Sequence, residues 1–398
     1  MSGRANRTPS DVITGRLVLA DGIRAGRLQV RDGLISRLEL DDEADGRLAD
    51  GELDAASWPY VLPGFVDIHV HGWGGHSAMG GRAALDGMAR ALLRRGVTSF
   101  LPTAVTASLD DLHSFAADVR SWLPSAPDDG ARPLGFNLEG PFLAPDKRGA
   151  HDARHLLSPA DVDNGRLEPL VDGLRVITIA PELPGARELI AWLVARGVVV
   201  SLGHSAASAE IAAEAYVLGA TSTTHLFNAM SGVDHRAPGL AVAALTNDDA
   251  YVELIADGHH VHRSLWRLIA RLKPGREEAG GLLLVSDALP LAGSGAARGF
   301  VGGLEVEVVG DRVTLAGSDT LAGSLIALDS AVRNFAMQGA TLANASMAAS
   351  RNPLSMLGIV DRGWLEAGQH ADLVEMDELL RVRRVMRGGE WFGGAGEL

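Results

Sequence analysis

The sequence GFVDIHVHGWGG at residues 64–75 joins an apolar run of strand length to two histidines, His69 and His71. Side chains two residues apart leave a β-strand on the same face, so the two imidazoles lie side by side. A polar strand end explains such a pair without special chemistry, whereas a metal site explains why both residues are histidines. The segments that follow distinguish these two explanations.

Strand-like and helix-like segments alternate after this first strand. Residues 81–96 have the apolar spacing of an amphipathic helix, as do residues 108–123, where Ser108 is the expected N-cap. The expected strands lie at residues 64–72, 97–105, 133–140, 175–182, 198–205, 221–230, 251–260 and 281–289. Because eight strands alternate with helices, we predict an α/β fold with a closed (β/α)8 TIM-like barrel rather than an open sheet.

The two ends of the chain carry short β segments instead. The expected elements outside the barrel strands are an acidic loop at 41–54, a Gly-rich pair of strands at 292–324, helices at 324–339 and 341–358, and short strands at 371–391. Chain termini often lie close together. We therefore predict a small β-sandwich domain formed by residues 1–61 and 354–398, beside a hydrolase barrel at residues 62–353.

The composition and the charge argue against several classes of protein. A formal net charge of -14 and the lack of a basic patch argue against nucleic-acid binding. No apolar run approaches the ~20 residues of a membrane helix, and the N-terminal residues lack the apolar core of a signal peptide. We therefore expect a cytoplasmic protein without nucleic-acid or membrane partners.

The chain has no cysteine, so histidine and carboxylate side chains would have to bind any metal. Such residues recur at the C-terminal ends of the expected strands: His69, His71, Glu139, His204, His225 and Asp287. Each one alone is explained as a hydrogen-bonded residue or a cap. In a barrel, however, all these strand ends meet on one face, where active sites lie. Together they predict a site for Zn²⁺, Fe²⁺ or Mn²⁺, in which a carboxylate not bound to metal can act as general base.

Longer motifs then carry a resemblance to a known family. They are LEGPFLAPDKRGAH (138–151), GHSAAS (203–208), THLFNAM (224–230), ADGHHVH (256–262), SDAL (286–289) and TLAGSLIALDSAVRN (320–334). From about residue 63 to residue 353 the chain resembles the N-acetylglucosamine-6-phosphate deacetylases of the amidohydrolase superfamily. Many members of that superfamily use a strand-end lysine to bridge two metals. Neither Lys147 nor Lys273 lies at a strand end here, and Glu139 takes that place.

The resemblance implies a metal centre of one or two divalent ions per subunit. Glu139, His204 and His225 would hold the ion common to the family, and His69 with His71 would hold a second one. Zn²⁺ is the first expectation, with Fe²⁺, Mn²⁺ or Co²⁺ as alternatives.

The resemblance also implies a reaction and a substrate site. The reaction is hydrolysis of N-acetyl-D-glucosamine 6-phosphate to D-glucosamine 6-phosphate and acetate, in amino-sugar catabolism or recycling. Asp287 would act as general base and then as general acid, while His151 contacts the amide carbonyl of the substrate. The implied contacts with the rest of the sugar phosphate are Asn228, Ala229, Arg236, His260, Leu321, Ala322 and Gly323. A homodimer is implied as well, with Arg236 near its interface.

Two other interpretations stay open at this point. One is a different amidohydrolase, which acts on another N-acyl sugar or on a cyclic amide. The other is a barrel that has lost its chemistry and serves as a scaffold. The complete set of candidate ligands and the acid Asp287 argue against a scaffold. Metal analysis of the purified protein tests this interpretation, because a scaffold should carry no stoichiometric metal.

Overall fold

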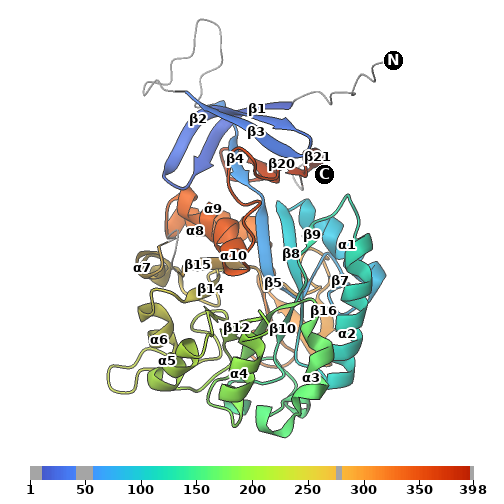
Figure 1. The fold of residues 1–398 in the computed structure, drawn as a ribbon, viewed down its shortest axis with the longest axis vertical. Coiled ribbons are helices and arrows are strands. Elements are labelled where there is room, and N and C mark those ends of the chain that lie inside the picture. Colours follow the sequence, from blue (N-terminus) through green and yellow to red (C-terminus); the bar gives the residue numbers. More distant parts are fainter. Residues whose placement is uncertain (1–10, 42–56, 275–279, 395–398) are drawn as a thin grey trace, which may run out of the picture.

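The fold is described from a computed structural model, which covers residues 11–41, 57–274 and 280–394. Figure 1 shows a barrel of strands surrounded by helices, with a second sheet next to the entry of the first barrel strand. The described residues contain no helix long and apolar enough to cross a membrane. The predicted acidic loop at 41–54 lies outside the described residues, apart from Asp41.

Eight parallel strands form the barrel. They are β5 (Phe65–Val70), β8 (Val97–Ala104), β10 (Phe136–Glu139), β11 (Leu174–Ile179), β12 (Val199–Leu202), β13 (Ser222–Thr223), β14 (Tyr251–Ile255) and β15 (Leu282–Val285), with the short β9 (Arg132–Pro133) paired to β8. Each strand pairs with the next, from β5 to β15. The parallel eight-stranded barrel predicted from the sequence is thus confirmed.

The barrel is nearly closed between its first and last strands. No continuous ladder joins β5 to β15 among the described residues. Instead, the Asp287 N–H donates to the His69 carbonyl (2.9 Å) and the His71 N–H donates to the Ala288 carbonyl (2.9 Å). The Asp67 carboxylate adds a side-chain bridge, since it accepts from the Ser286 N–H at 3.3 Å. The hydrogen bonds that close the barrel between β5 and β15 therefore lie near the strand ends that carry the candidate ligands.

Helices cover the outside of the barrel. They are α1 (Arg82–Leu93), α2 (Leu109–Trp122), α3 (Asn164–Val171), α4 (Ala186–Val194), α5 (Ala209–Val217), α6 (Leu240–Thr246), α7 (Trp266–Leu272) and α8 (Leu328–Gln338), followed by α9 (Leu342–Ala349) and α10 (Arg351–Met356). The predicted N-cap is confirmed, because the Ser108 hydroxyl accepts from the Asp111 N–H. The apolar faces of α1 to α9 pack against the outward side chains of the strands in one large hydrophobic cluster.

Three predicted elements differ from the structure. The strand expected at 221–230 has only two residues, because the chain turns sharply at His225, where φ is 28°. The single helix expected at 341–358 is split at Ser350, whose φ of −134° is not helical. The Gly-rich pair of strands expected at 292–324 is a three-stranded antiparallel sheet: β16 (Arg298–Val301), β17 (Leu304–Val309) and β18 (Arg312–Leu315).

One end of the barrel interior is apolar. Inward side chains of β5, β8, β11, β14 and β15 form a separate buried cluster with residues of α10 and the turn after it: Val66, Ile68, Leu101, Val176, Ile255, Leu283, Val285, Leu354, Met356 and Leu357. The Asn352 side chain donates to the carbonyl of Leu282 at the start of β15 (2.8 Å), which places α10 across the amino ends of the strands. The barrel is therefore a packed core that is open only at its other end.

The second sheet unites the two ends of the chain. Its seven strands lie in the order β21 (Glu390–Gly393), β20 (Val382–Arg387), β19 (Leu373–Met376), β4 (Tyr60–Pro63), β1 (Asp11–Leu19), β2 (Gly22–Arg31) and β3 (Leu34–Leu40). Strand β4 is central, because it pairs with β1 on one side and with β19 on the other. The chain passes from β4 through Gly64 directly into the first barrel strand.

Candidate metal and substrate site

The backbone turns sharply where the candidate ligands leave the barrel strands. His204, His225 and Asp287 follow β12, β13 and β15, and their φ angles are 46°, 28° and 49°. Non-glycine residues rarely adopt this left-handed conformation, which costs about 1–3 kcal/mol each and persists only where the surroundings impose it. These turns direct the three side chains across the mouth of the barrel instead of outward.

The first strand reaches the site through an irregularity. Val66 and Ile68 belong to the apolar cluster in the barrel, and Val70 belongs to the outer cluster. The register of β5 against β8 shifts between Asp67 and Val70, which changes the alternation of the side chains. His69 and His71 consequently share the inward face, as their spacing predicted.

Glu139 lies at the centre of the histidines. Its Oε1 is 3.0 Å from His204 Nε2 and 2.9 Å from His225 Nε2, and these two nitrogens are 3.0 Å from each other. Its Oε2 is 3.2 Å from His71 Nε2 and 3.2 Å from His151 Nε2. Each oxygen of this carboxylate thus lies within 3.2 Å of two imidazole nitrogens.

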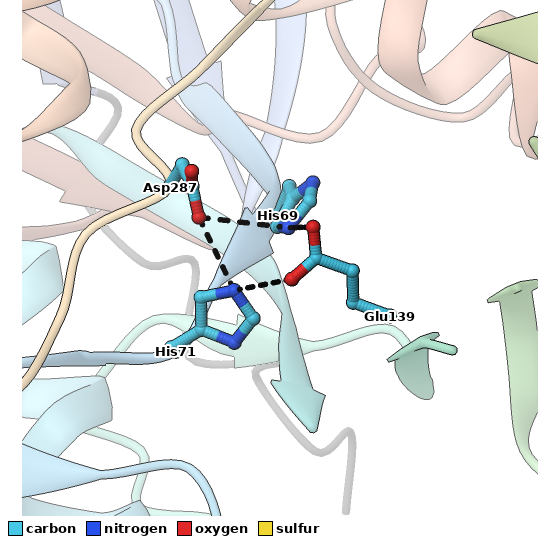
Figure 2. A group of neighbouring side chains, drawn as sticks. All are labelled: His69, His71, Glu139 and Asp287. Carbon is cyan, nitrogen blue, oxygen red and sulfur yellow. Dashed lines mark ion pairs between the residues drawn. The ribbon is translucent and has the colours of Figure 1, made fainter. Parts of the chain in front are cut away.

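A second group lies on the other side of this carboxylate. Figure 2 shows His69, His71 and Asp287 around Glu139. Asp287 Oδ1 is 3.2 Å from His71 Nε2 and 3.6 Å from His69 Nε2, which is itself 3.6 Å from Glu139 Oε1. One ligand atom from each of the four residues lies within 4.8 Å of the others. Glu139 therefore stands between two candidate ligand sets, one with His204 and His225 and the other with His69, His71 and Asp287.

The outer nitrogens of three histidines fix their tautomers. His71 Nδ1 lies 3.0 Å from the Thr103 carbonyl, and His204 Nδ1 lies 2.8 Å from the Lys147 carbonyl. Because a carbonyl only accepts, Nδ1 carries the proton in both. His69 Nδ1 likewise donates to Glu253 Oε2 at 2.9 Å. In the neutral imidazoles, the lone pair of each Nε2 then faces Glu139, as expected for metal ligands.

His151 has the opposite arrangement. Its Nδ1 accepts a hydrogen bond from the Thr106 backbone N–H at 3.3 Å. The proton of the neutral ring is therefore on Nε2, which points into the site toward Glu139. His151 thus offers a donor, whereas the three other rings offer lone pairs.

The electrostatics of the site fit a bound cation. Burial opposes protonation of His71, yet its hydrogen bonds to Asp287 and Glu139 raise the pKa to about 9. Burial lowers the pKa of His204 to about 4, despite the hydrogen bond to Glu139. Within the described part of the chain, His69 Nε2 and His225 Nδ1 are buried without hydrogen-bond partners. Converging carboxylates, facing lone pairs and the unpartnered His69 Nε2 suit a divalent metal ion.

A cavity of about 430 Å³ opens over this centre. The residues expected in the site that line it are His71, Glu139, His151, His204, His225, Asn228, Ala229, His260, Asp287, Leu321, Ala322 and Gly323. His69 lies below its floor, fully buried. Val301 and Val306 of the three-stranded sheet form part of the wall. The size suits a substrate of the dimensions of a sugar phosphate.

Arg236 is the expected substrate residue that does not line the cavity. It lies exposed in the loop before α6, where its N–H donates to Asp234 Oδ1 at 2.7 Å. His260, in contrast, is held in the wall by Asp257, whose Oδ2 is 2.7 Å from the His260 Nδ1. The structure of one chain therefore brings His260, but not Arg236, to the candidate substrate site.

The sequence did not single out three groups that orient the histidines. Two are the main-chain carbonyls of Thr103 and Lys147, which leave no signature in a sequence. The third is Glu253, in the strand segment YVELIAD. A carboxylate inside an otherwise apolar strand was the available signal, because a buried charge needs a partner.

Comparisons with known proteins extend over nearly the whole chain. The amidohydrolase family matches residues 60–392. The N-acetylglucosamine-6-phosphate deacetylase of Bos taurus is 38% identical over 97% of this chain and 96% of that protein. The N-acetylgalactosamine-6-phosphate deacetylase of Escherichia coli O157:H7 is 35% identical over 92% of this chain and 98% of that protein. The chain is also similar to a solved structure from Mycobacterium smegmatis, of an N-acetyl-D-glucosamine-6-phosphate deacetylase mutant in complex with N-acetyl-D-glucosamine-6-phosphate. The TM-score is 0.85 and the sequence identity is 33%, and the match covers 96% of this chain and 99% of that one.

Proposed function

This chain belongs to the amidohydrolase family, and we propose that it hydrolyses N-acetyl-D-glucosamine 6-phosphate to D-glucosamine 6-phosphate and acetate. The observation that carries the proposal is the position of Glu139 between two ligand sets on the floor of a sugar-sized cavity. The deacetylase relatives, which match over both the barrel and the second sheet, support the same activity. The reaction belongs to amino-sugar catabolism or recycling.

Two groups of residues are proposed to hold the metal. Glu139, His204 and His225 would hold one ion, and His69 and His71 would hold a second. A divalent ion in such a site polarises an amide carbonyl and lowers the pKa of water. Zn²⁺ is the first candidate because nitrogen and carboxylate ligands without sulfur suit it, although they also suit Fe²⁺, Mn²⁺ and Co²⁺.

Asp287 is the proposed general base and acid. Burial opposes its ionisation, but the hydrogen bond with His71 holds the pKa of Asp287 below its ordinary value, so the carboxylate is ionised at neutral pH. It can then accept the proton of the attacking water and deliver that proton to the leaving nitrogen. His151 is the proposed donor to the carbonyl oxygen, because its Nε2–H points into the cavity.

The sugar phosphate is proposed to lie against the cavity residues that surround the metal centre. Asn228, Ala229 and His260 line the cavity there, together with the loop Leu321, Ala322 and Gly323. Arg236 is exposed and outside the cavity of its own chain, so we propose that it reaches the phosphate of a second subunit in a homodimer. A guanidinium binds a phosphate bidentately, which suits this role.

The chain is also proposed to divide into two domains, a small β-sandwich of residues 1–61 and 354–398 and the barrel of residues 62–353. A separate hydrophobic cluster supports this division, since all its buried members come from the two terminal segments: Ile13, Leu17, Leu28, Val30, Ile35, Val61, Leu365, Ala371, Leu373 and Met386. Residues 354–357 are an exception, because Leu354, Met356 and Leu357 pack inside the barrel. The cytoplasmic location expected from the sequence stays a prediction.

A second candidate substrate is N-acetyl-D-galactosamine 6-phosphate, which differs in the orientation of one hydroxyl. The Escherichia coli O157:H7 relative, a deacetylase of that sugar, favours this alternative at 35% identity. Acetate release should be measured with both phosphorylated sugars and with unphosphorylated N-acetylglucosamine, and metal content should be measured on the same sample. The proposal expects the highest kcat/KM for N-acetyl-D-glucosamine 6-phosphate and fails if no acetate is released from it by metal-loaded protein.

A further inference from the structure

Glu253 is a buried carboxylate that the proposed reaction does not use. It is the third residue of β14, its exposed fraction is 1%, and its neighbours in the strand are apolar. Its Oε1 has no hydrogen-bond partner within the described residues. A buried acid of this kind destabilises a protein unless the hydrogen bonds of its other oxygen compensate for the lost hydration.

The other oxygen of Glu253 contacts both candidate ligand sets. Oε2 accepts from His69 Nδ1 at 2.9 Å and from the backbone N–H of His225 at 3.1 Å. His69 lies in β5 and His225 follows β13, so a single oxygen joins residues from two different parts of the barrel. The second contact also holds the backbone of His225 at its unusual φ of 28°.

This anchor differs from those of the other ligands. His71 and His204 donate to the main-chain carbonyls of Thr103 and Lys147, which are neutral. Only His69 donates to a charged side chain, which makes its ring a stronger electron donor toward a metal ion. A substitution at Glu253 can change the hydrogen-bond partner of His69, whereas a main-chain carbonyl is present whichever residue occupies the position.

We propose that Glu253 is a positioning residue that couples the two halves of the metal centre. Its carboxylate fixes the tautomer of His69 for one half and the backbone of His225 for the other half. Loss of the charge therefore weakens binding of both metal equivalents rather than one. This inference rests on the proposed function only in assuming that the site binds metal.

The test uses Glu253→Gln in the full chain, with Glu182→Gln as matched control. Glutamine keeps the size of glutamate, but its amide can either donate or accept, so the His69 tautomer is no longer fixed. Glu182 also accepts near the site, from the Ser205 hydroxyl at 2.7 Å, but it contacts no imidazole. Zn²⁺ affinity should be measured by chelator competition, metal content by elemental analysis, and melting temperature with and without Zn²⁺.

We expect Glu253→Gln to weaken Zn²⁺ binding about 10–100-fold for each equivalent that the wild type binds. The melting temperature of its metal-free form should stay at or above that of the wild type, because a buried charge is removed. Glu182→Gln should change the affinity less than about threefold. Unchanged affinity in Glu253→Gln, weakening of one equivalent while a second stays intact, or an equal loss of melting temperature with and without Zn²⁺ would overturn the inference. A wild-type protein that binds no Zn²⁺, Fe²⁺, Mn²⁺ or Co²⁺ would instead overturn the proposed function.

Discussion

The two ends of the barrel are built from the same eight strands, but they differ in chemistry and in backbone conformation. The end near α10 is filled by aliphatic side chains such as Leu101, Leu283 and Leu354. The opposite end holds converging imidazoles and carboxylates, and some of their buried nitrogens have no partner among the described residues. Of the seven non-glycine residues with positive φ in the described ranges, five lie in the segments that follow β12, β13 and β15: His204, His225, Phe227, Ala229 and Asp287.

This difference shows how one fold separates stability from chemistry. The apolar end gains free energy of folding from burial, at roughly 25 cal/mol per Å² of apolar surface. The polar end gives up part of that gain, because strained turns and crowded charges are unfavourable without a ligand. Substitutions at the two ends should therefore affect different measurements.

The largest effect is expected from Asp287→Asn at the polar end. Asparagine keeps the shape but cannot accept the proton of water, so kcat should fall by about 10²–10⁴-fold. The ion proposed for Glu139, His204 and His225 should stay bound, and the melting temperature should change little. Acetate release and metal content on one sample check this, and a near-normal kcat would exclude Asp287 as the base.

The double substitution His69→Ala and His71→Ala tests whether the polar end contains two separable ligand sets. The proposed ligands Glu139, His204 and His225 remain, so one metal equivalent should be lost while the other stays bound. Elemental analysis of protein loaded with excess Zn²⁺, for the variant and the wild type, measures the difference. Loss of all bound metal would mean that the two sets form one indivisible site.

At the apolar end, Leu354→Ala should act on stability alone. Leu354 is fully buried in the cluster inside the barrel, and truncation of such a side chain costs about 2–5 kcal/mol. The free energy of unfolding in denaturant should fall by that amount, while KM and metal content stay as in the wild type. A changed KM with unchanged stability would show that the two ends are not independent.

Much of this division could be predicted from the sequence. Strand length and alternation predicted the barrel, and polar residues at strand ends predicted its polar face, including Glu139 and Asp287. The spacing of His69 and His71 predicted their shared face. These features depend on local periodicity, which a sequence carries directly.

Other features depend on contacts between distant segments and were not predictable. The two-residue length of β13 follows from the turn at His225, which is held in part by Glu253 on the next strand. The tautomers of His71 and His204 depend on carbonyls of other segments, and a carbonyl is present at every position. The break between α9 and α10, in contrast, had a local signal, because Pro353 cannot donate to the Ala349 carbonyl of a continuous helix and its ring clashes with that carbonyl.

A smaller effect is expected from Arg236→Ala, which tests whether a second subunit completes the polar end. Loss of a charge-assisted hydrogen bond of about 1.5–3 kcal/mol should raise KM for the phosphorylated sugar roughly 10–100-fold. Hydrolysis of the unphosphorylated sugar should not change. Arg271→Ala removes an exposed arginine of α7, outside the cavity lining, and serves as control. An unchanged KM in Arg236→Ala would remove this residue from the phosphate site.

The most gradual effect is the dependence of metal binding on pH. Hydrogen bonds to Asp287 and Glu139 raise the pKa of His71 to about 9 in the metal-free protein, against an ordinary value of 6.5. Protonation of His71 therefore stabilises the metal-free fold fully below about pH 6.5, and this contribution is lost as the pH rises through about 9.

A metal ion must displace that proton, so its affinity should rise with pH in the same interval, by up to about tenfold per unit for one released proton. Chelator competition with Zn²⁺ between pH 6.5 and 9 measures the slope. Melting temperatures provide the second measurement: the metal-free protein should become less stable across this range, while the metal-loaded protein should not follow it. A flat affinity, or parallel melting curves for the two forms, would mean that no proton on His71 competes with the metal.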